Sequence, residues 1–365
     1  MSTLQYNINR TNGEPIYLQL YRLLCRDIVT GTYPYGSKLP SKRLLAAELD
    51  ISIVTVEHAL TILCDEGYVG ARERSGYFVI YRAGDCFTGT PPSHTHIQHT
   101  PHTEATDDLL PYTVLARIMR RVLSDYGGEI MLRSPHTGTE VLRQAIAAYL
   151  ARSRGLTVDA AQIIIGAGAE YLYSLTVQLL GRTHTFGVED PCYEKIRAVY
   201  TANGASFQPL KMGNEGIEST ALEASTATVL HVTPYHSYPS GVSATASKRQ
   251  EYLAFAERRN GYLIEDDFDS EFTVSSKMED TLFSLDSEGR VIYMNTFTKT
   301  VAPSLRVGYM VLPHTLLDRF HAHCGFYACT VPTFEQLVLA ELLNSGDFER
   351  HINRQRRKKR RALQK

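Results

Sequence analysis

No stretch of this 365-residue chain is long and apolar enough for a membrane-spanning helix, which needs about 20 consecutive apolar residues. Residues 1–15 are polar and lack the apolar centre of a signal peptide. The six cysteines are scattered, with no Cys-x-x-Cys pair, so we expect buried thiols in a reducing compartment rather than a disulfide framework. These absences predict a cytoplasmic protein that has no membrane partner.

The chain also has almost no net charge, because 38 Lys and Arg oppose 39 Asp and Glu. A balanced charge gives no overall attraction to nucleic acid or to a membrane. Hydrophobic residues make up 43% of the chain and charged residues 21%, which is typical of a globular protein. The length leaves room for two or three domains.

Residues 1–80 have the pattern of a small separate domain. Apolar side chains recur at helical spacing in three segments, and Ser41 and Ser52 stand where the second and third helices should begin. Two β-rich runs then bracket residues 72–76, which predicts a hairpin with a Ser-Gly turn. Three short helices followed by a hairpin are typical of a winged helix-turn-helix domain.

Residues 81–108 lose this periodicity and contain three prolines and several threonines. We interpret them as a polar linker. Metal binding is the alternative, because the segment holds four histidines: His94, His96, His99 and His102. Nothing in the pattern organises these histidines into a ligand set, so we predict no metal site.

Strands and helices alternate from residue 109 to residue 365. Short β-rich runs at 163–165, 228–232, 262–264 and 291–293 are separated by helical patterns. This predicts an α/β domain with a largely parallel sheet. Ligands of such sheets bind at the carboxyl ends of the strands, which is where the residues that can carry chemistry stand in this sequence.

Lys299 follows the last of these runs. It is flanked by the hydroxyls of Thr296 and Thr298 and, seven residues on, by Arg306. A lone lysine at a strand end is usually solvated surface. An amine among hydroxyls and a guanidinium suits a Schiff base beside a phosphate, which points to pyridoxal phosphate. Arg306 suits the phosphate because a guanidinium forms charge-assisted forked hydrogen bonds.

Two other strand ends supply matching groups. Gly168, Ala169 and Glu170 open a helix, where backbone N–H groups and the helix dipole favour a phosphate. A tight strand-to-helix turn is an equal explanation of the glycine. Asp266 belongs to five carboxylates within residues 265–271, and we predict that it holds the protonated pyridine nitrogen. A solvated loop or a metal site is the alternative for this run.

Three further side chains follow other strand runs. We expect Tyr193 to cover the face of the cofactor ring, and His236 or Tyr238 to reach the ring's phenolic oxygen. Ordinary packing of Tyr193 and loop hydrogen bonding by His236 are the alternatives. Each motif is weak by itself, and their order and shared position after strands favour a cofactor site.

With these residues collected, the chain resembles the MocR/GabR-type members of the GntR regulators. That family joins a winged helix to a domain like the fold type I aminotransferases. The resemblance covers nearly the whole chain and rests on residues 15–17, 39–43, 55–56, 66–68, 189–193, 233–241, 265–272 and 296–308. It implies a Schiff base on Lys299, Asp266 at the pyridine nitrogen, a homodimer, and promoter DNA as the partner.

Two departures from the family concern single residues. Phe268 stands where a tyrosine is usual, and a phenylalanine cannot hydrogen-bond the cofactor oxygen. Ile53 replaces a common arginine on the third helix, which also carries Glu57, and residues 1–80 hold eight basic and eight acidic side chains. We therefore expect a modest salt dependence of DNA binding. The expected DNA contacts are Ser41, Arg43, Ser52, Thr55, Arg72 and Arg74.

A third departure concerns the end of the chain. The resemblance implies a small C-terminal domain, and we expect most of it to be missing. The basic run 354–361 looks like the helix that enters that domain, and a nucleic-acid-binding tail is the alternative.

The leading hypothesis is a transcription regulator that uses pyridoxal phosphate on Lys299 as cofactor or effector, with a small amine or amino acid as a candidate effector. One rival is a working aminotransferase with a vestigial DNA-binding domain. Another is a truncated inactive product. The sequence leaves open whether transaminase activity remains.

Overall fold

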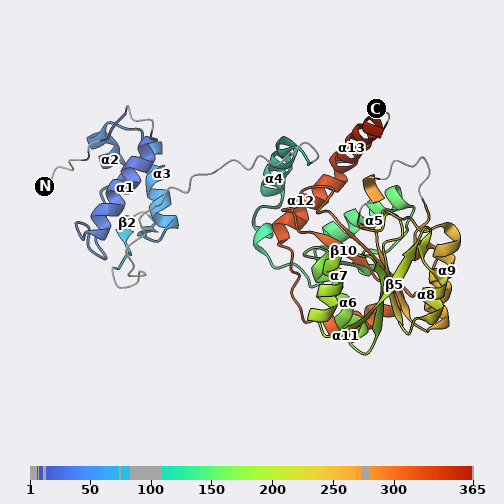
Figure 1. The fold of residues 1–365 in the computed structure, drawn as a ribbon. Coiled ribbons are helices and arrows are strands. Elements are labelled where there is room, and N and C mark those ends of the chain that lie inside the picture. The colour runs from blue at the N-terminus through green and yellow to red at the C-terminus, as the bar shows by residue number, and fades with distance from the viewer. Residues whose placement is uncertain are drawn as a thin grey trace. The chain divides into compact units, whose positions relative to one another are not determined.

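The computed structural model describes residues 6, 8–10, 14–73, 75–82, 109–268, 270–272 and 279–363. The chain divides into two compact units, Met1–Pro101 and His102–Lys365 (Figure 1). The linker predicted at 81–108 lies outside the described residues, apart from Tyr81 and Arg82. Its four histidines therefore lie outside them as well.

The first unit is a winged helix-turn-helix domain, as the sequence predicts. Its helices and its hairpin are α1 (Ile16–Val29), α2 (Lys42–Leu49), α3 (Ile53–Asp65), β1 (Val69–Arg72) and β2 (Gly76–Val79). The two strands pair antiparallel, with Arg72 opposite Gly76. Apolar side chains from every one of these elements form a single core that includes Leu24, Leu45, Leu60, Val69 and Val79.

Two serines begin the second and third helices of this unit. Ser41 caps α2, because its Oγ accepts a hydrogen bond from the N–H of Leu44 at 3.2 Å. Ser52 caps α3 in the same way, with the N–H of Thr55 at 3.0 Å. Each hydroxyl satisfies a backbone donor that the first helical turn leaves without a partner.

The second unit is built on an eight-stranded sheet of order β3-β10-β9-β8-β7-β4-β5-β6. The pairs from β9 to β5 are parallel, whereas β10 is antiparallel to β3 and β9, and β6 is antiparallel to β5. The sheet is thus largely parallel, as predicted. The strands are β3 (Ile163–Gly166), β4 (Thr185–Asp190), β5 (Ser206–Gly213), β6 (Gly216–Ile217), β7 (Val229–Val232), β8 (Tyr262–Asp266), β9 (Val291–Thr296) and β10 (Gly308–Val311).

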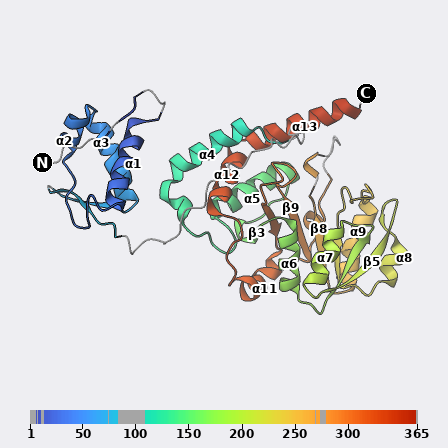
Figure 2. The same ribbon diagram turned by 60° about the vertical axis from the view of Figure 1, so that its left-hand side comes forward.

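Helices cover both faces of this sheet (Figures 1 and 2). Ile164 and Ile292 pack in one core with α6, α7 and α11, whereas Ile163 and Tyr293 pack in another with α4, α5, α12 and α13. A third core lies under α8 and α9. The helices are α4 (Tyr112–Tyr126), α5 (Glu140–Arg154), α6 (Ala169–Leu180), α7 (Glu194–Ala202), α8 (Ser219–Ala224), α9 (Ala246–Arg258), α10 (Leu282–Leu285), α11 (His314–Cys324), α12 (Thr333–Asn344) and α13 (Asp347–Leu363), with 3-10 turns η3 (Gly127–Met131), η4 (Ala160–Gln162) and η5 (Ser270–Phe272).

This arrangement brings several strand ends to one edge of the sheet. The parallel strands β4, β7, β8 and β9 are neighbours, so their carboxyl ends point the same way. Loops that are far apart in the sequence therefore meet there. Within the described ranges, no helix is long and apolar enough to cross a membrane.

Candidate functional site

A cavity of about 340 Å³ lies at this edge of the sheet. Nine of the residues predicted to bind the cofactor line it: Ala169, Glu170, Tyr193, Tyr238, Asp266, Thr296, Thr298, Lys299 and Arg306. The start of α6, the turn before α7, the loop after β7, the end of β8, and the end of β9 with the turn after it contribute them. The wall is completed by Tyr173, Glu189, Cys192, Ile196, Thr233 and Phe268.

One end of the cavity has the properties of an anion site. Gly168 is the N-cap of α6 at φ +85°, and no side chain caps that helix. A Cβ at Gly168 would meet the Nη2 atom of Arg306 at 2.9 Å, so only glycine lets the guanidinium approach this turn. An uncapped helix start beside an arginine presents N–H donors and positive charge to an anion.

The carboxylate of Glu170 neutralises part of this positive charge. Its carboxylate accepts hydrogen bonds from Arg306 and, at 2.8 Å, from Lys195. Burial by itself would raise the pKa of Glu170, but the hydrogen bonds from Lys195, the backbone and Arg306 outweigh it and lower the pKa to about 2. Glu170 is therefore ionised across the physiological range and balances the two cations.

Lys299 lines the cavity on the turn after β9. Its Nζ atom lies 4.3 Å from the centroid of the Phe268 ring. An ammonium over an aromatic face is attracted by the ring quadrupole. The phenylalanine therefore contacts the lysine through its face, and the hydroxyl that a tyrosine would add is missing from this wall.

The three carboxylates at the end of β8 have separate partners. Asp266 is 3% exposed, lines the cavity, and accepts a hydrogen bond from the hydroxyl of Tyr173 through Oδ2. Glu265 accepts from Tyr235 at 2.6 Å and from two backbone N–H groups at 2.9 Å. Asp267 accepts from Arg154 and, at 2.6 Å, from the hydroxyl of Tyr293.

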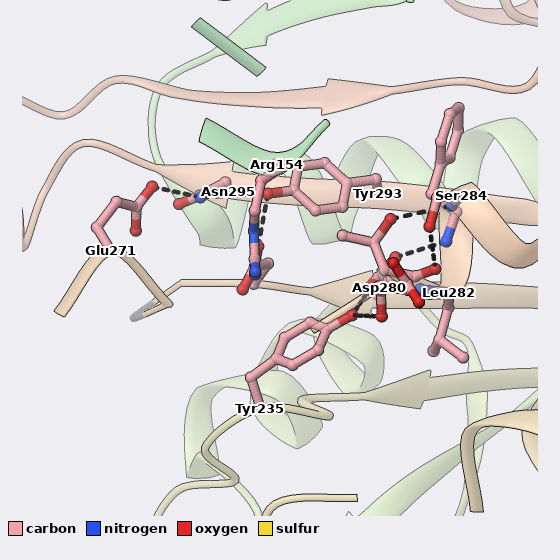
Figure 3. A network of polar contacts seen from close by, with 12 residues as sticks. Arg154, Tyr235, Glu271, Asp280, Leu282, Ser284, Tyr293 and Asn295 are labelled. Atoms are coloured by element: carbon pink, nitrogen blue, oxygen red, sulfur yellow. Dashed lines mark hydrogen bonds and ion pairs between the residues drawn. The ribbon is translucent and has the colours of Figure 1, made fainter. Parts of the chain in front are cut away.

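Figure 3 shows Arg154, Tyr235 and Tyr293 in one region of polar contacts. Glu265 and Asp267 are the carboxylates that accept their hydrogen bonds. Burial, opposed by the hydrogen bond from Tyr235 and reinforced by the charge of Asp267, raises the pKa of Glu265 to about 7. Only Asp266 of the three lines the 340 Å³ cavity. In the described part of the chain, no group of three or more His, Cys, Asp or Glu is placed to hold a metal ion.

Two predicted residues lie beside the cavity rather than in its wall. Gly168 underlies Arg306, as described above. His236 lines a neighbouring space of about 10 Å³ together with Tyr235 and Asp267. Tyr173 and Ile196 were not predicted, although Tyr173 follows Ala169 by one helical turn and therefore shares its face of α6.

The described residues among those predicted to contact DNA are exposed or half-buried on the first unit. Arg43 and Arg72 are exposed, and the guanidinium of Arg72 stacks 4.4 Å from the Phe78 ring centroid. Ser41 and Ser52 cap α2 and α3, and the hydroxyls of Ser52 and Thr55 lie 2.8 Å apart. Glu57 on α3 pairs with Lys42 on α2. Arg74 lies outside the described residues.

The cavity residues fit pyridoxal phosphate. They combine a primary amine, a buried carboxylate and an anion site with aromatic walls from Tyr193, Phe268 and Tyr238. This donor set matches the aldehyde, the basic ring nitrogen, the phosphate and the ring faces of that cofactor.

Comparison with known proteins agrees with this chemistry. Residues 107–364 match the family model for aminotransferase class I and II, and residues 16–79 match the one for bacterial regulatory proteins of the gntR family. The HTH-type transcriptional regulator YdeL of Bacillus subtilis, itself uncharacterised, is 36% identical over 98% of this chain and 80% of its own length. The probable rhizopine catabolism regulatory protein MocR of Rhizobium meliloti is 28% identical over 96% of this chain and 76% of its own.

A solved structure of similar fold is LysN, the α-aminoadipate aminotransferase of Thermus thermophilus, complexed with N-(5'-phosphopyridoxyl)-L-leucine. It is 26% identical with a TM-score of 0.61 over 69% of this chain, which spans 64% of the LysN chain. Pyridoxal phosphate is the cofactor of the second unit. The fold class and the resemblance inferred from the sequence are confirmed. The chain belongs to the MocR-type transcription regulators, in which a GntR winged helix is joined to a domain of the aminotransferase class I and II family.

Proposed function

We propose that this chain is a cytoplasmic transcription regulator that binds promoter DNA through α2, α3 and the hairpin of its first domain. Its second domain binds pyridoxal phosphate covalently through Lys299. The observation that carries the proposal is the convergence of Lys299, Asp266 and Arg306 on one cavity, in a chain that also carries a GntR winged helix.

The residues predicted to bind the cofactor receive separate roles in this proposal. The Nζ atom of Lys299 bonds to the aldehyde carbon, and Asp266 holds the proton on the ring nitrogen. Arg306, Thr296, Thr298 and the start of α6 bind the phosphate, with Gly168 allowing the close approach of Arg306. When bound, pyridoxal phosphate supplies an electron-accepting ring and an aldehyde that exchanges one amine for another. Tyr193 covers the ring face, and Tyr238 reaches the ring's phenolic oxygen.

Control of DNA binding follows from this exchange. A small amine or amino acid competes with Lys299 for the aldehyde and so changes the contacts around the cavity. Such an effector alters DNA affinity only if it binds two arrangements of the protein with different affinity. We propose a homodimer, because two winged helices then read two half-sites of one operator.

Two titrations test the proposal. Purified protein loaded with pyridoxal phosphate should absorb near the wavelength of the lysine-bound cofactor, and Lys299→Ala should lose this band. Lys211→Ala should keep it, because Lys211 is exposed on β5 and pairs with Glu218. DNA from the promoter of the protein's own gene should bind with a modest salt dependence. A wild-type protein without the band would contradict the cofactor part of the proposal. A wild-type protein that does not bind the promoter would contradict the DNA-binding part.

The rival function is amino-acid transamination, and the shared fold with LysN supports it. Lys299, Asp266 and Arg306 serve both functions equally. Phe268 favours regulation, because the cavity wall lacks a hydroxyl at that position. Turnover of any amino acid with an oxo acid by the pure protein, lost in Lys299→Ala, would establish the rival.

A further inference from the structure

Three buried polar side chains form a network of close contacts with Asp266. Tyr173 on α6 donates its hydroxyl hydrogen to Oδ2 of Asp266. The Nε2 atom of His231 on β7 lies 3.7 Å from the same oxygen. The Nδ1 atom of His231 lies 2.6 Å from the hydroxyl of Tyr200 on α7. All four side chains are at most 4% exposed.

His231 is unusual for a central strand of a parallel sheet. Its neighbours on β7 are Val229, Leu230 and Val232, and such strands are normally apolar throughout because both faces are covered. The histidine is 2% exposed, and its Nε2 atom has no hydrogen-bond partner among the described residues. A buried polar atom without a partner lowers stability, so a role is required to explain it.

The electrostatics favour one tautomer of this ring. Burial, reinforced by the charge of Asp266, raises the pKa of Tyr200 well above its usual value, so the phenol keeps its hydrogen and can donate it to Nδ1. The imidazole proton then sits on Nε2, which faces the carboxylate. The opposite tautomer would turn a lone pair toward an acceptor.

The hydroxyl of Tyr173 therefore donates to Oδ2, and the Nε2–H of His231 lies 3.7 Å from the same oxygen, beyond hydrogen-bond range, and acts on it electrostatically. Among the described residues, no hydrogen bond reaches the other oxygen of Asp266, Oδ1. His231 itself does not line the cavity, whereas Asp266 and Tyr173 do. The geometry thus turns one carboxylate oxygen toward the protein and leaves the second for a ligand.

We propose that His231 is a positioning residue for the cofactor's ring nitrogen: with Tyr200 and Tyr173 it fixes Oδ2 of Asp266, so that Oδ1 faces the ring as an acceptor. This inference rests on the proposed assignment of Asp266 to the ring nitrogen. It extends that assignment to a residue that touches neither the cofactor nor the cavity. The ring-nitrogen contact should therefore weaken when His231 is replaced, while the phosphate and lysine contacts stay intact.

The test compares two cofactors that differ only at the ring nitrogen. Dissociation constants are measured for pyridoxal 5'-phosphate and for 1-deazapyridoxal 5'-phosphate, in which a C–H replaces the nitrogen. His231→Leu should weaken binding of the first about tenfold, as expected for loss of a charge-assisted contact, and leave the second within about twofold. His231→Gln should restore most of the affinity, because its amide replaces the Nε2 donor.

His184→Leu is the matched control. His184 lies just before β4, is half-buried, and bonds Thr228 through Nδ1 at 2.8 Å without contacting Asp266. Both affinities should stay unchanged in that variant. Tyr200→Phe keeps the imidazole and nearly all the packed volume, so it provides a second test if His231→Leu does not fold. It should weaken the natural cofactor selectively but by less.

Equal losses for the two cofactors in the His231 and Tyr200 variants, or no loss, would overturn the inference and leave His231 a packing residue. Failure of the wild-type protein to bind either cofactor would instead overturn the proposed function. The two failures are therefore distinguishable in one experiment.

Discussion

One ion pair of the first domain and one of the second lie in opposite environments. In the first domain Arg10 pairs with Asp50, and their side chains are 57% and 93% exposed. In the second domain Arg154 pairs with Asp267 at 9% and 1% exposure. Salt screens the attraction within an exposed pair, and its cation exchanges its carboxylate partner easily for another anion. A buried pair is screened much less and keeps its partner. Arg10 can thus exchange its partner for another anion such as a DNA phosphate, whereas Arg154 and Asp267 keep a fixed charge pattern inside the second domain.

Removal of one partner from each pair should give the largest contrast. Arg154→Leu leaves Asp267 buried without its cation, and the free energy of unfolding of the second domain should fall by about 3–5 kcal/mol. Arg10→Leu should cost less than about 1 kcal/mol in the first domain. Chemical denaturation followed by circular dichroism measures both. Similar losses in the two variants would contradict the contrast between the domains.

The buried carboxylates should also make the second domain sensitive to pH. Burial, reinforced by the charge of Asp267, raises the pKa of Glu271 from 4.5 to about 7. The folded state then binds this proton more tightly than the unfolded state, so stability falls as the pH rises from 4.5 to about 7. Glu271→Gln should make this fall in stability smaller in a pH series of thermal denaturation. The part of the fall that remains should come from Glu265, whose pKa is also raised to about 7.

Glu218→Gln is the control for that series. Glu218 forms a partly exposed pair with Lys211, so its replacement should leave the pH dependence unchanged. A wild-type stability that rises between these pH values would show that Glu271 is stabilised in its charged form.

In the first domain the helix caps should contribute more to stability than the ion pairs do. Ser52→Ala removes the hydroxyl that caps α3 and should cost about 1 kcal/mol, with weaker DNA binding because α3 begins at this residue. Ser52→Asp should restore stability, because a carboxylate accepts the same N–H. Thermal denaturation and a DNA titration check the two effects. An alanine variant as stable as wild type would mean that water replaces the cap.

Loss of a single surface arginine should have the smallest effect. Arg72→Ala removes one phosphate contact and should lower the slope of log affinity against log salt by about one, equally for all DNA sequences. Arg22→Ala serves as the control, since Arg22 pairs with Glu14 and lies on α1. A change in sequence preference without a change in slope would assign Arg72 to a base edge instead.

The features that can be predicted from the sequence are those encoded by residues close together in the chain. The helices of the first domain follow apolar periodicity and serine caps, which depend only on near neighbours in the chain. Lys299, Asp266 and Arg306 were predicted from their positions after β-rich runs, and they line one cavity. Their roles stay predictions.

Long-range pairing explains what the sequence does not predict. The antiparallel strand β10 inserts between β3 and β9, and nothing in the residues Gly308–Val311 encodes that neighbour choice. Tyr173 is 93 residues from Asp266 in the sequence, and His231 is several tens of residues from it. Both contacts therefore arise only when α6, β7 and β8 pack together. A lone histidine in an apolar run carries no signal of such a contact.

The most direct measurement is the identity of the lysine that holds the cofactor. Protein loaded with pyridoxal phosphate is reduced with borohydride, digested, and mapped by peptide mass. A phosphopyridoxyl group on the peptide that contains Lys299, and on no other, is the predicted result. A label on another lysine, or none in a protein that still binds its promoter DNA, would contradict a cofactor site at Lys299.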